Sequence, residues 1–298
     1  MAVINLGSIN IDHVYQVEHF VQPGETLASS DYQRVLGGKG ANQSIALARA
    51  GIKVLHLGAL NHADQDFKQQ MIDYGVDCGR VALTDIASGH AIIQVIPSGE
   101  NAIVLFGGAN QQITQQAIQA TVDNADSNDW FLTQNETAQV PQALQMARQA
   151  GLSVAYNPAP VTDVVKQVNP DWVDLLIVNQ TEAQVISGCD DLQTQIDYFQ
   201  SQWPNSQVLL TLGQSGAKMI SKSSVLSVDA YDVQAVDTTA AGDTFIGFFL
   251  AAFCGGMEAG QAMQQACAAA AIAVTKAGAA QSIPALTDVQ NFIRENHK

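Results

Sequence analysis

Short apolar runs alternate with helix-type stretches along most of the chain. Apolar runs typical of buried strands lie at 3–6, 54–60, 130–132, 154–156, 175–178 and 208–211. Helix-type patterns lie at 40–50, 64–74, 139–150, 162–168, 190–201, 243–254 and 258–276. Strands that are apolar throughout and alternate with helices are typical of a parallel sheet covered on both faces. The pattern therefore predicts a doubly wound α/β fold with a mostly parallel sheet and helices on both faces.

Two segments interrupt this alternation. Residues 13–36 carry short mixed segments, and residues 90–106 form two β-rich runs around a turn at 98–101. Antiparallel strands of this kind predict a small second sheet, from about 13–36 and 88–108, which could act as a lid over the ligand-binding ends of the parallel strands. Ordinary surface hairpins are the alternative. The chain has no internal repeat or long linker, so we expect one domain over residues 1–298.

Composition and charge exclude several classes of protein. The chain has 28 acidic and 13 basic residues and a formal net charge of −15, which disfavours binding to nucleic acid or to an anionic membrane surface. Its longest apolar stretches, 245–254 and 266–274, are too short to span a bilayer, and its first ten residues lack the basic segment of a secretory signal. We expect a cytoplasmic protein in which the scattered cysteines are reduced core residues, namely Cys78, Cys189, Cys254 and Cys267.

The common nucleotide-binding motifs are absent. Gly7 has no partner glycines of a G-x-G-x-x-G motif, so a dinucleotide-dependent dehydrogenase is disfavoured. The pair Gly38-Lys39 lacks the upstream glycine and the following Ser or Thr of a P-loop. Any nucleotide site in this chain must therefore use other residues.

Small residues lead into an apolar helix within VDTTAAGDTF, residues 236–245. Ala240, Ala241 and Gly242 allow the backbone to approach a ligand closely, and the free N–H groups of the helix start would form an anion hole. Asp243 lies in the first turn. It either caps the helix or acts as a base that takes a hydroxyl proton while phosphate is attacked.

Two further segments place polar groups near predicted strand and helix ends. In LGGKGANQ, residues 36–43, glycines allow close approach while Lys39 and Asn42 supply donors; an ordinary Gly-rich turn is the alternative. In GSINID, after the first strand, Asn10 and Asp12 supply an amide and a carboxylate. A carboxylate can accept from two neighbouring hydroxyls, which suits a vicinal diol, although turn formation by Asn and Asp is the alternative.

In their order along the chain, these motifs resemble those of the ribokinase-like (PfkB) carbohydrate kinases. The resemblance covers nearly the whole length and includes GSINID at 7–12, PGET at 23–26, GGKGANQ at 37–43, NPAP at 157–160, NQTEA at 179–183, TLGQSG at 211–216, VDTTAAGDTF at 236–245 and AAAAIAVTKAGAAQSIP at 268–284. Each short motif could arise by chance, whereas the ordered set hardly could. The resemblance implies that the γ-phosphate of Mg·ATP is transferred to the O5 hydroxyl of D-ribose under a closing lid.

The resemblance also implies a role for individual residues. Asp243 would be the catalytic base, with the N–H groups of 240–242 as the anion hole. The residues implied to bind the sugar are Asn10, Asp12, Gly38, Lys39, Asn42, Glu136 and Asp243. The residues implied to bind the nucleotide are Asn179, Thr211, Gly213, Gly216, Gly242 and Cys267, the last standing where many family members have a His.

Two metal ions are implied by the same resemblance. Asn179 and Glu182 would organise Mg²⁺ through water, with Gln180 replacing the usual Glu between them. An activating K⁺ would be surrounded, mostly by backbone carbonyls, by Asp237, Thr239, Ala273, Lys276, Gly278 and Ser282.

Some alternatives stay open from the sequence. The acceptor could be 2-deoxyribose, a hexose or a nucleoside instead of ribose, or the chain could be a sugar-binding regulator without catalysis. Retention of four residues disfavours the regulator, namely Asp243, Gly242, Asn179 and Glu182. The alternating apolar residues at 91–96 and 102–106 predict a homodimer formed through the lid, although they could equally seal the sugar site of a monomer. His90 could face the sugar or be a half-exposed strand residue.

Overall fold

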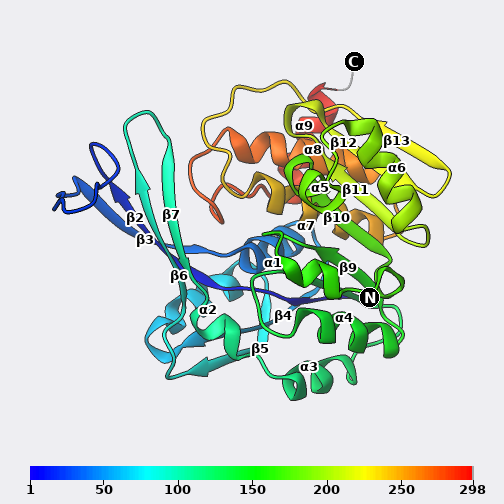
Figure 1. Cartoon of the computed structure of the whole chain (residues 1–298), viewed down its shortest axis with the longest axis horizontal. Coiled ribbons are helices and arrows are strands. Elements are labelled where there is room, and N and C mark those ends of the chain that lie inside the picture. The colour runs from blue at the N-terminus through cyan, green and yellow to red at the C-terminus, as the bar shows by residue number, and fades with distance from the viewer. Residues whose placement is uncertain (297–298) are drawn as a thin grey trace.

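A nine-stranded sheet forms the body of the molecule, with helices on both faces (Figure 1). The structure, a computed structural model, describes residues 1–296. The strand order is β13-β12-β11-β10-β9-β8-β1-β4-β5, and every pair from β11 to β5 is parallel. The predicted doubly wound, mostly parallel α/β fold is therefore confirmed. Its strands are β1 Val3–Leu6, β4 Val54–Asn61, β5 Asp77–Thr84, β8 Trp130–Gln134, β9 Ser153–Asn157, β10 Leu175–Asn179, β11 Gln207–Thr211, β12 Ala217–Ser221 and β13 Ser224–Val228.

The helices form one layer on each face of this sheet. They are α1 Lys39–Arg49, α2 Gln65–Asp73, α3 Gln115–Val122, α4 Val140–Gln149, α5 Gln180–Ser187, α6 Leu192–Gln202, α7 Ala241–Cys254, α8 Ala259–Val274 and α9 Leu286–Asn296. The stretch 162–168, expected to be helical, forms a 3₁₀ helix at Asp163–Gln167. Among the described residues, no helix is both long enough and apolar enough to cross a membrane.

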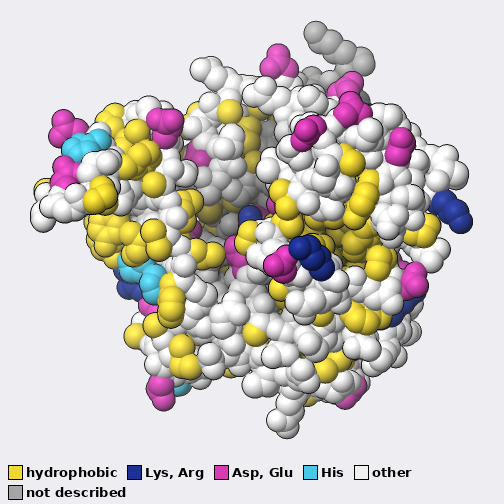
Figure 2. Space-filling model, viewed as in Figure 1, with side chains coloured by type: hydrophobic (Ala, Val, Ile, Leu, Met, Phe, Trp, Pro, Cys, Tyr) yellow, Lys and Arg dark blue, Asp and Glu magenta, His cyan; other side chains and the backbone are white. Residues whose placement is uncertain are grey.

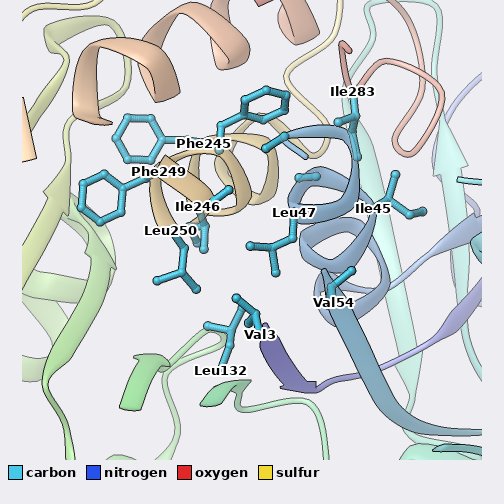
Figure 3. Packing of buried hydrophobic residues seen from close by; sticks show 14 of the residues in the cluster. Val3, Ile45, Leu47, Val54, Leu132, Phe245, Ile246, Phe249, Leu250 and Ile283 are labelled. Carbon is cyan, nitrogen blue, oxygen red and sulfur yellow. The ribbon is translucent and has the colours of Figure 1, made fainter. Parts of the chain in front are cut away.

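Two separate hydrophobic cores explain why the strands are apolar throughout. Successive residues of a strand point to opposite faces. Ile177 accordingly packs in the core with α1, α7 and α8, while its neighbours Leu176 and Val178 pack in the core under α4, α5 and α6. Figure 3 shows the first core, where α7 residues such as Phe249 and Leu250 lie above the sheet.

A small four-stranded sheet projects from one end of the body (Figure 1). Its order is β3-β2-β6-β7, with β2 Asn10–Gln16, β3 Asp31–Gly37, β6 Gly89–Val95 and β7 Asn101–Phe106. The predicted second sheet is thus present, and β2 begins three residues before the expected range. The expectation of antiparallel strands was incomplete, because β2 and β6 pair in parallel while the other two pairs are antiparallel.

The order of the strands fixes where polar loop residues can meet. Strand β1 pairs with β4 on one side and with β8 on the other, so the chain order reverses beside β1. Ligands of doubly wound folds bind at such a reversal, outside the carboxyl ends of the strands. Residues 7–10, which follow β1, and residues 135–136, which follow β8, both lie at this edge.

Candidate active site

Asp243 is held at the start of α7 by two amide side chains from α1. Asn42 Nδ2 donates to Asp243 Oδ2 at 3.0 Å, and Gln43 Nε2 donates to Oδ1 at 2.9 Å. The two helices approach closely because Gly247 lies against Ala46, where an added Cβ would stand 2.3 Å from the alanine Cβ. The contact brings together two motifs that are about 200 residues apart in the sequence.

The surroundings of Asp243 suit a general base. Burial raises the pKa of its carboxyl, while the charge of Lys39 and the hydrogen bonds from Gln43 and Asn42 act to lower it, and the net pKa lies above the usual value. A carboxylate with a raised pKa accepts a proton more readily. Among the described residues, the Asp243 carboxylate accepts no hydrogen bond from a backbone N–H of the helix start, so the structure does not support its alternative role as a helix cap.

A buried polar network, which the sequence did not reveal, supports Gln43 from behind. Gln134 Nε2 donates to Gln43 Oε1 at 2.7 Å and to Asn5 Oδ1 at 3.0 Å. Gln43 Nε2 also donates to Asn157 Oδ1 at 3.1 Å. Because each amide is bonded on more than one side, the side chain that orients Asp243 has little freedom to rotate.

His56 lies at the far end of this network and is neutral. Ser44 Oγ lies 2.8 Å from His56 Nδ1, and His56 Nε2 lies 3.1 Å from the carbonyl oxygen of Gly7. Since a carbonyl only accepts, Nε2 carries the proton and Nδ1 accepts from the serine. Complete burial lowers the pKa of His56 to about 4.

The N–H groups at the start of α7 are only partly available to a ligand. The N–H of Ala241 donates to Thr238 O at 3.2 Å, which differs from the predicted anion hole of 240–242. Within the described residues, the N–H groups of Gly242 and Asp243 have no protein acceptor. An added Cβ on Gly242 would meet no atom within 4 Å, so this side of the turn is open.

A cavity of about 250 Å³ lies beside this helix start. Figure 2 shows the molecule hollowed between the small sheet and the body. Seven of the predicted site residues line the cavity together, namely Lys39, Asn179, Glu182, Thr211, Ala240, Gly242 and Asp243. The structure therefore brings the predicted base, the helix start and part of the predicted nucleotide site into one pocket.

Lys39 lines this pocket with Asp243 and Glu182, and a third carboxylate, Glu136, also acts on its charge. Asp243 contributes most to raising the pKa of Lys39, burial opposes the effect, and Glu136 and Glu182 raise it further. The side chain of Lys39 is half-buried at the site and belongs to the first turn of α1. Its charge is available to an anion that enters beside Asp243.

Asn179 and Glu182 are joined in a capping box at the start of α5. The N–H of Glu182 donates to Asn179 Oδ1 at 2.8 Å, and the N–H of Asn179 donates to Glu182 Oε2 at 2.9 Å. Burial raises the pKa of Glu182. No cluster of three or more His, Cys, Asp or Glu able to hold a metal occurs in residues 1–296. Mg²⁺ commonly keeps several waters and is held by one or two carboxylates and by substrate phosphates, and the Mg²⁺ site at Asn179 and Glu182 stays a prediction.

The predicted sugar-binding residues lie where the small sheet meets the body. Glu136 Oε2 accepts from Ser8 Oγ at 2.5 Å and from the N–H of Lys39 at 3.1 Å. Burial, and to a lesser extent the charge of Glu136, raises the pKa of Asp12 to about 6. Gly37 leaves room for Asp12, because an added Cβ would lie 2.0 Å from Asp12 Oδ2.

Asn42 and Gly38 complete this side of the site. Within residues 1–296, the Oδ1 atom of Asn42 is buried without a partner while its Nδ2 donates to Asp243, so one acceptor is left for a ligand hydroxyl. Gly38 has a φ of 92° and passes close to the backbone of Asn10 and Ser8. Only glycine adopts this conformation readily and allows the approach.

His90 lies on the other face of the small sheet. It pairs with Ile11, between the partners of Asn10 and Asp12, so its side chain points away from theirs. It lines a separate cavity together with Arg34 and Asp64. His90 is therefore a half-buried strand residue and does not face the predicted sugar site.

The predicted nucleotide residues beyond the pocket occupy different environments. Gly213 and Gly216 flank a 3₁₀ turn with φ values of 57° and 85°. An added Cβ would meet nothing within 4 Å at Gly213, but would stand 2.0 Å from Val228 O at Gly216. Gly213 is thus open to a ligand, whereas Gly216 serves the fold. Cys267 belongs to α8, packs in the first core and is 5% exposed, so little of its side chain can reach a nucleotide.

The loop positions implied to surround K⁺ belong to two segments that Asp237 joins. Its Oδ1 accepts from the N–H of Thr239 and its Oδ2 from the N–H of Gly278, both at 2.8 Å. Burial acts to raise the pKa of Asp237, but these hydrogen bonds outweigh it and lower that pKa. The K⁺ site stays a prediction, and its other positions are Ala273, Lys276 and Ser282.

Comparison with known proteins gives the family. Residues 2–286 match the family described as pfkB family carbohydrate kinase. A ribokinase from Haemophilus influenzae is 36% identical over 97% of each chain. The solved structure of a ribokinase from Thermotoga maritima has a TM-score of 0.89 at 29% identity, and that of a ribokinase from Arabidopsis thaliana complexed with ribose and ATP has a TM-score of 0.87 at 25% identity, each covering 99% of both chains. These matches confirm the predicted resemblance, and the chain belongs to the pfkB family of carbohydrate kinases.

Proposed function

We propose that this chain transfers the γ-phosphate of ATP to the O5 hydroxyl of D-ribose, giving ribose 5-phosphate. The observation that carries the proposal is the position of Asp243 in the pocket at the open start of α7, where two amides from α1 orient it. The relative from Haemophilus influenzae is named a ribokinase, and the related structure from Arabidopsis thaliana contains ribose and ATP. Both names support ribose as the acceptor.

The residues of the site divide the chemistry among them. Asn10, Asp12 and Asn42 bind the sugar hydroxyls, and the small sheet closes over the sugar and excludes water. Asp243 accepts the proton of the attacking hydroxyl as that oxygen bonds to the γ-phosphorus and the bond to the β-phosphate oxygen breaks. Lys39 and the free N–H of Gly242 stabilise the charge on the transferring phosphate. A Mg²⁺ organised through water by Asn179 and Glu182 would neutralise nucleotide charge.

The outer edge of the small sheet bears on how the chain assembles. All six residues of β7 are exposed, and Val104 is 69% exposed at the edge of the small sheet. An apolar edge strand can pair with another strand, which supports a homodimer through the lid.

The four cysteines are all free, which supports a reducing cytoplasmic setting.

A coupled assay of ADP release tests the function and the implied cations together. The purified chain is given Mg·ATP with ribose, 2-deoxyribose, fructose, tagatose or adenosine, each with and without K⁺. Selective turnover of ribose is the expected result, with stimulation by K⁺ if the loop around Asp237 binds that ion. Selective turnover of another acceptor would overturn ribose while keeping the kinase, and sugar binding without turnover would favour the regulator.

A further inference from the structure

Asn110 reaches the sugar side of the site from a distant segment of the chain. It lies in the 3₁₀ helix Gly108–Gln112 that follows β7, and it is 1% exposed. The N–H of Ile9 donates to Asn110 Oδ1 at 3.0 Å, and Asn110 Nδ2 donates to Ile9 O at 3.2 Å and to Asn10 Oδ1 at 2.8 Å. Sequence motifs gave no sign of this residue.

These bonds fix which way the Asn10 amide faces. A backbone N–H can only donate, so the atom of Asn110 that faces the Ile9 N–H must be the oxygen. The nitrogen of Asn110 then faces Asn10, and the atom of Asn10 that accepts from it must be Oδ1. The Nδ2 group of Asn10 is therefore turned away from Asn110, and it has no protein acceptor among the described residues.

Gly89 makes this contact possible. It pairs with Asn10 in the small sheet, and an added Cβ would lie 2.1 Å from Asn110 Nδ2 and 2.4 Å from Asn10 Oδ1. A side chain at position 89 would therefore separate the two asparagines. Asn10 and Asp12 are two residues apart on one strand and face the same side.

We infer that Asn110 is a positioning residue that makes Asn10 a hydrogen-bond donor beside the acceptor Asp12. Asn10 and Asp12 together then present one donor and one acceptor to neighbouring hydroxyls of the sugar. A sugar that lacks one of these hydroxyls leaves a buried polar group unpaired and is rejected. The inference rests on the proposed function and adds to it a source of selectivity for a diol.

A double-mutant cycle of Asn10→Ala and Asn110→Ala tests the inference, with sugar Kd, KM and kcat measured for each variant. Asn110→Ala should raise the KM for ribose about tenfold, the effect of one lost buried hydrogen bond, and leave the KM for ATP unchanged. It should also lower the preference for ribose over 2-deoxyribose. In the Asn10→Ala background it should have no further effect on the KM for ribose.

Two further variants keep the test decisive. Asn110→Asp, assayed at pH 8, retains an acceptor for the Ile9 N–H and removes the donor to Asn10, so it carries the test if the alanine variant fails to fold. Gln195→Ala removes an equally buried amide on α6, bonded to Cys189 O, and should leave sugar selectivity unchanged. The inference would be overturned if the double mutant raised the KM for ribose by the product of the two single effects. It would also be overturned if Asn110→Ala weakened ribose and 2-deoxyribose equally. Wild-type turnover tests the proposed function separately, and whichever sugar it accepts serves for the variants.

Discussion

Sugar affinity should depend on the ionisation of Asp12. Burial and the charge of Glu136 raise the pKa of this carboxyl to about 6 in the free protein. The ionised form accepts hydrogen bonds from two hydroxyls, whereas the protonated form uses one oxygen as a donor. With that pKa, about nine tenths of Asp12 is ionised at pH 7 and about one tenth at pH 5. Binding that requires the carboxylate should therefore weaken about tenfold between pH 7 and pH 5.

Calorimetric titration with ribose, without nucleotide, from pH 5 to pH 8 measures this dependence. Asp12→Asn should lower the affinity and remove the step centred near pH 6. Glu136→Gln removes one cause of the raised pKa, so the midpoint should move to lower pH even though the affinity itself falls. Wild-type affinity that stays within about twofold between pH 7 and pH 5, or an undiminished step in Asp12→Asn, would refute the reasoning.

Three other variants address the base, the buried network and the lid. Asp243→Asn should lower kcat at least about 100-fold while keeping ribose binding, and near-normal ADP release would reject the base. His56 has a pKa of about 4 in the folded state against 6.5 unfolded, so folding stability should fall as pH drops from 6.5 towards 4, by about 3 kcal/mol. Urea unfolding measures this, and His56→Gln should lack that component of the pH dependence. Val104→Glu places a charge on the exposed edge of β7 and should give a monomer of 31.6 kDa by light scattering, whereas a dimer that persists would contradict assembly through the lid.

The body of the fold could be predicted because its strands are buried on both faces. Leu176 and Ile177 contribute to different cores, so the whole strand is apolar and stands out in the sequence. Strand β13 carried no such signal, since all but its last residue is exposed. Strand burial therefore decides which elements a pattern reveals.

The residues of the site also differ in whether the sequence alone could reveal them. Asp12 and Asp243 belong to the short motifs GSINID and VDTTAAGDTF, so local sequence was enough to predict a role for them. Asn110 acts through a contact 100 residues away, and its segment has no motif of its own. Ala240 adopts a φ of 57°, a conformation that favours glycine, and this turn directs the Ala241 N–H to Thr238 instead of a ligand. Neither arrangement follows from residue type or spacing.

The direction of hydrogen bonds explains how so acidic a chain can receive an anionic nucleotide. Charges on the distant surface are screened within about 8–10 Å at physiological salt, so the field at the pocket depends on nearby groups. Glu182 is bonded to the start of α5 and Glu136 to the backbone N–H of Lys39, so each carboxylate is partly neutralised by a protein donor. The charge of Lys39 and the unpaired N–H of Gly242 remain directed at the cavity. The electrostatic potential at the entering phosphate therefore depends on which nearby donors are left unpaired. The net charge of −15, spread over the distant surface, does not oppose phosphoryl transfer.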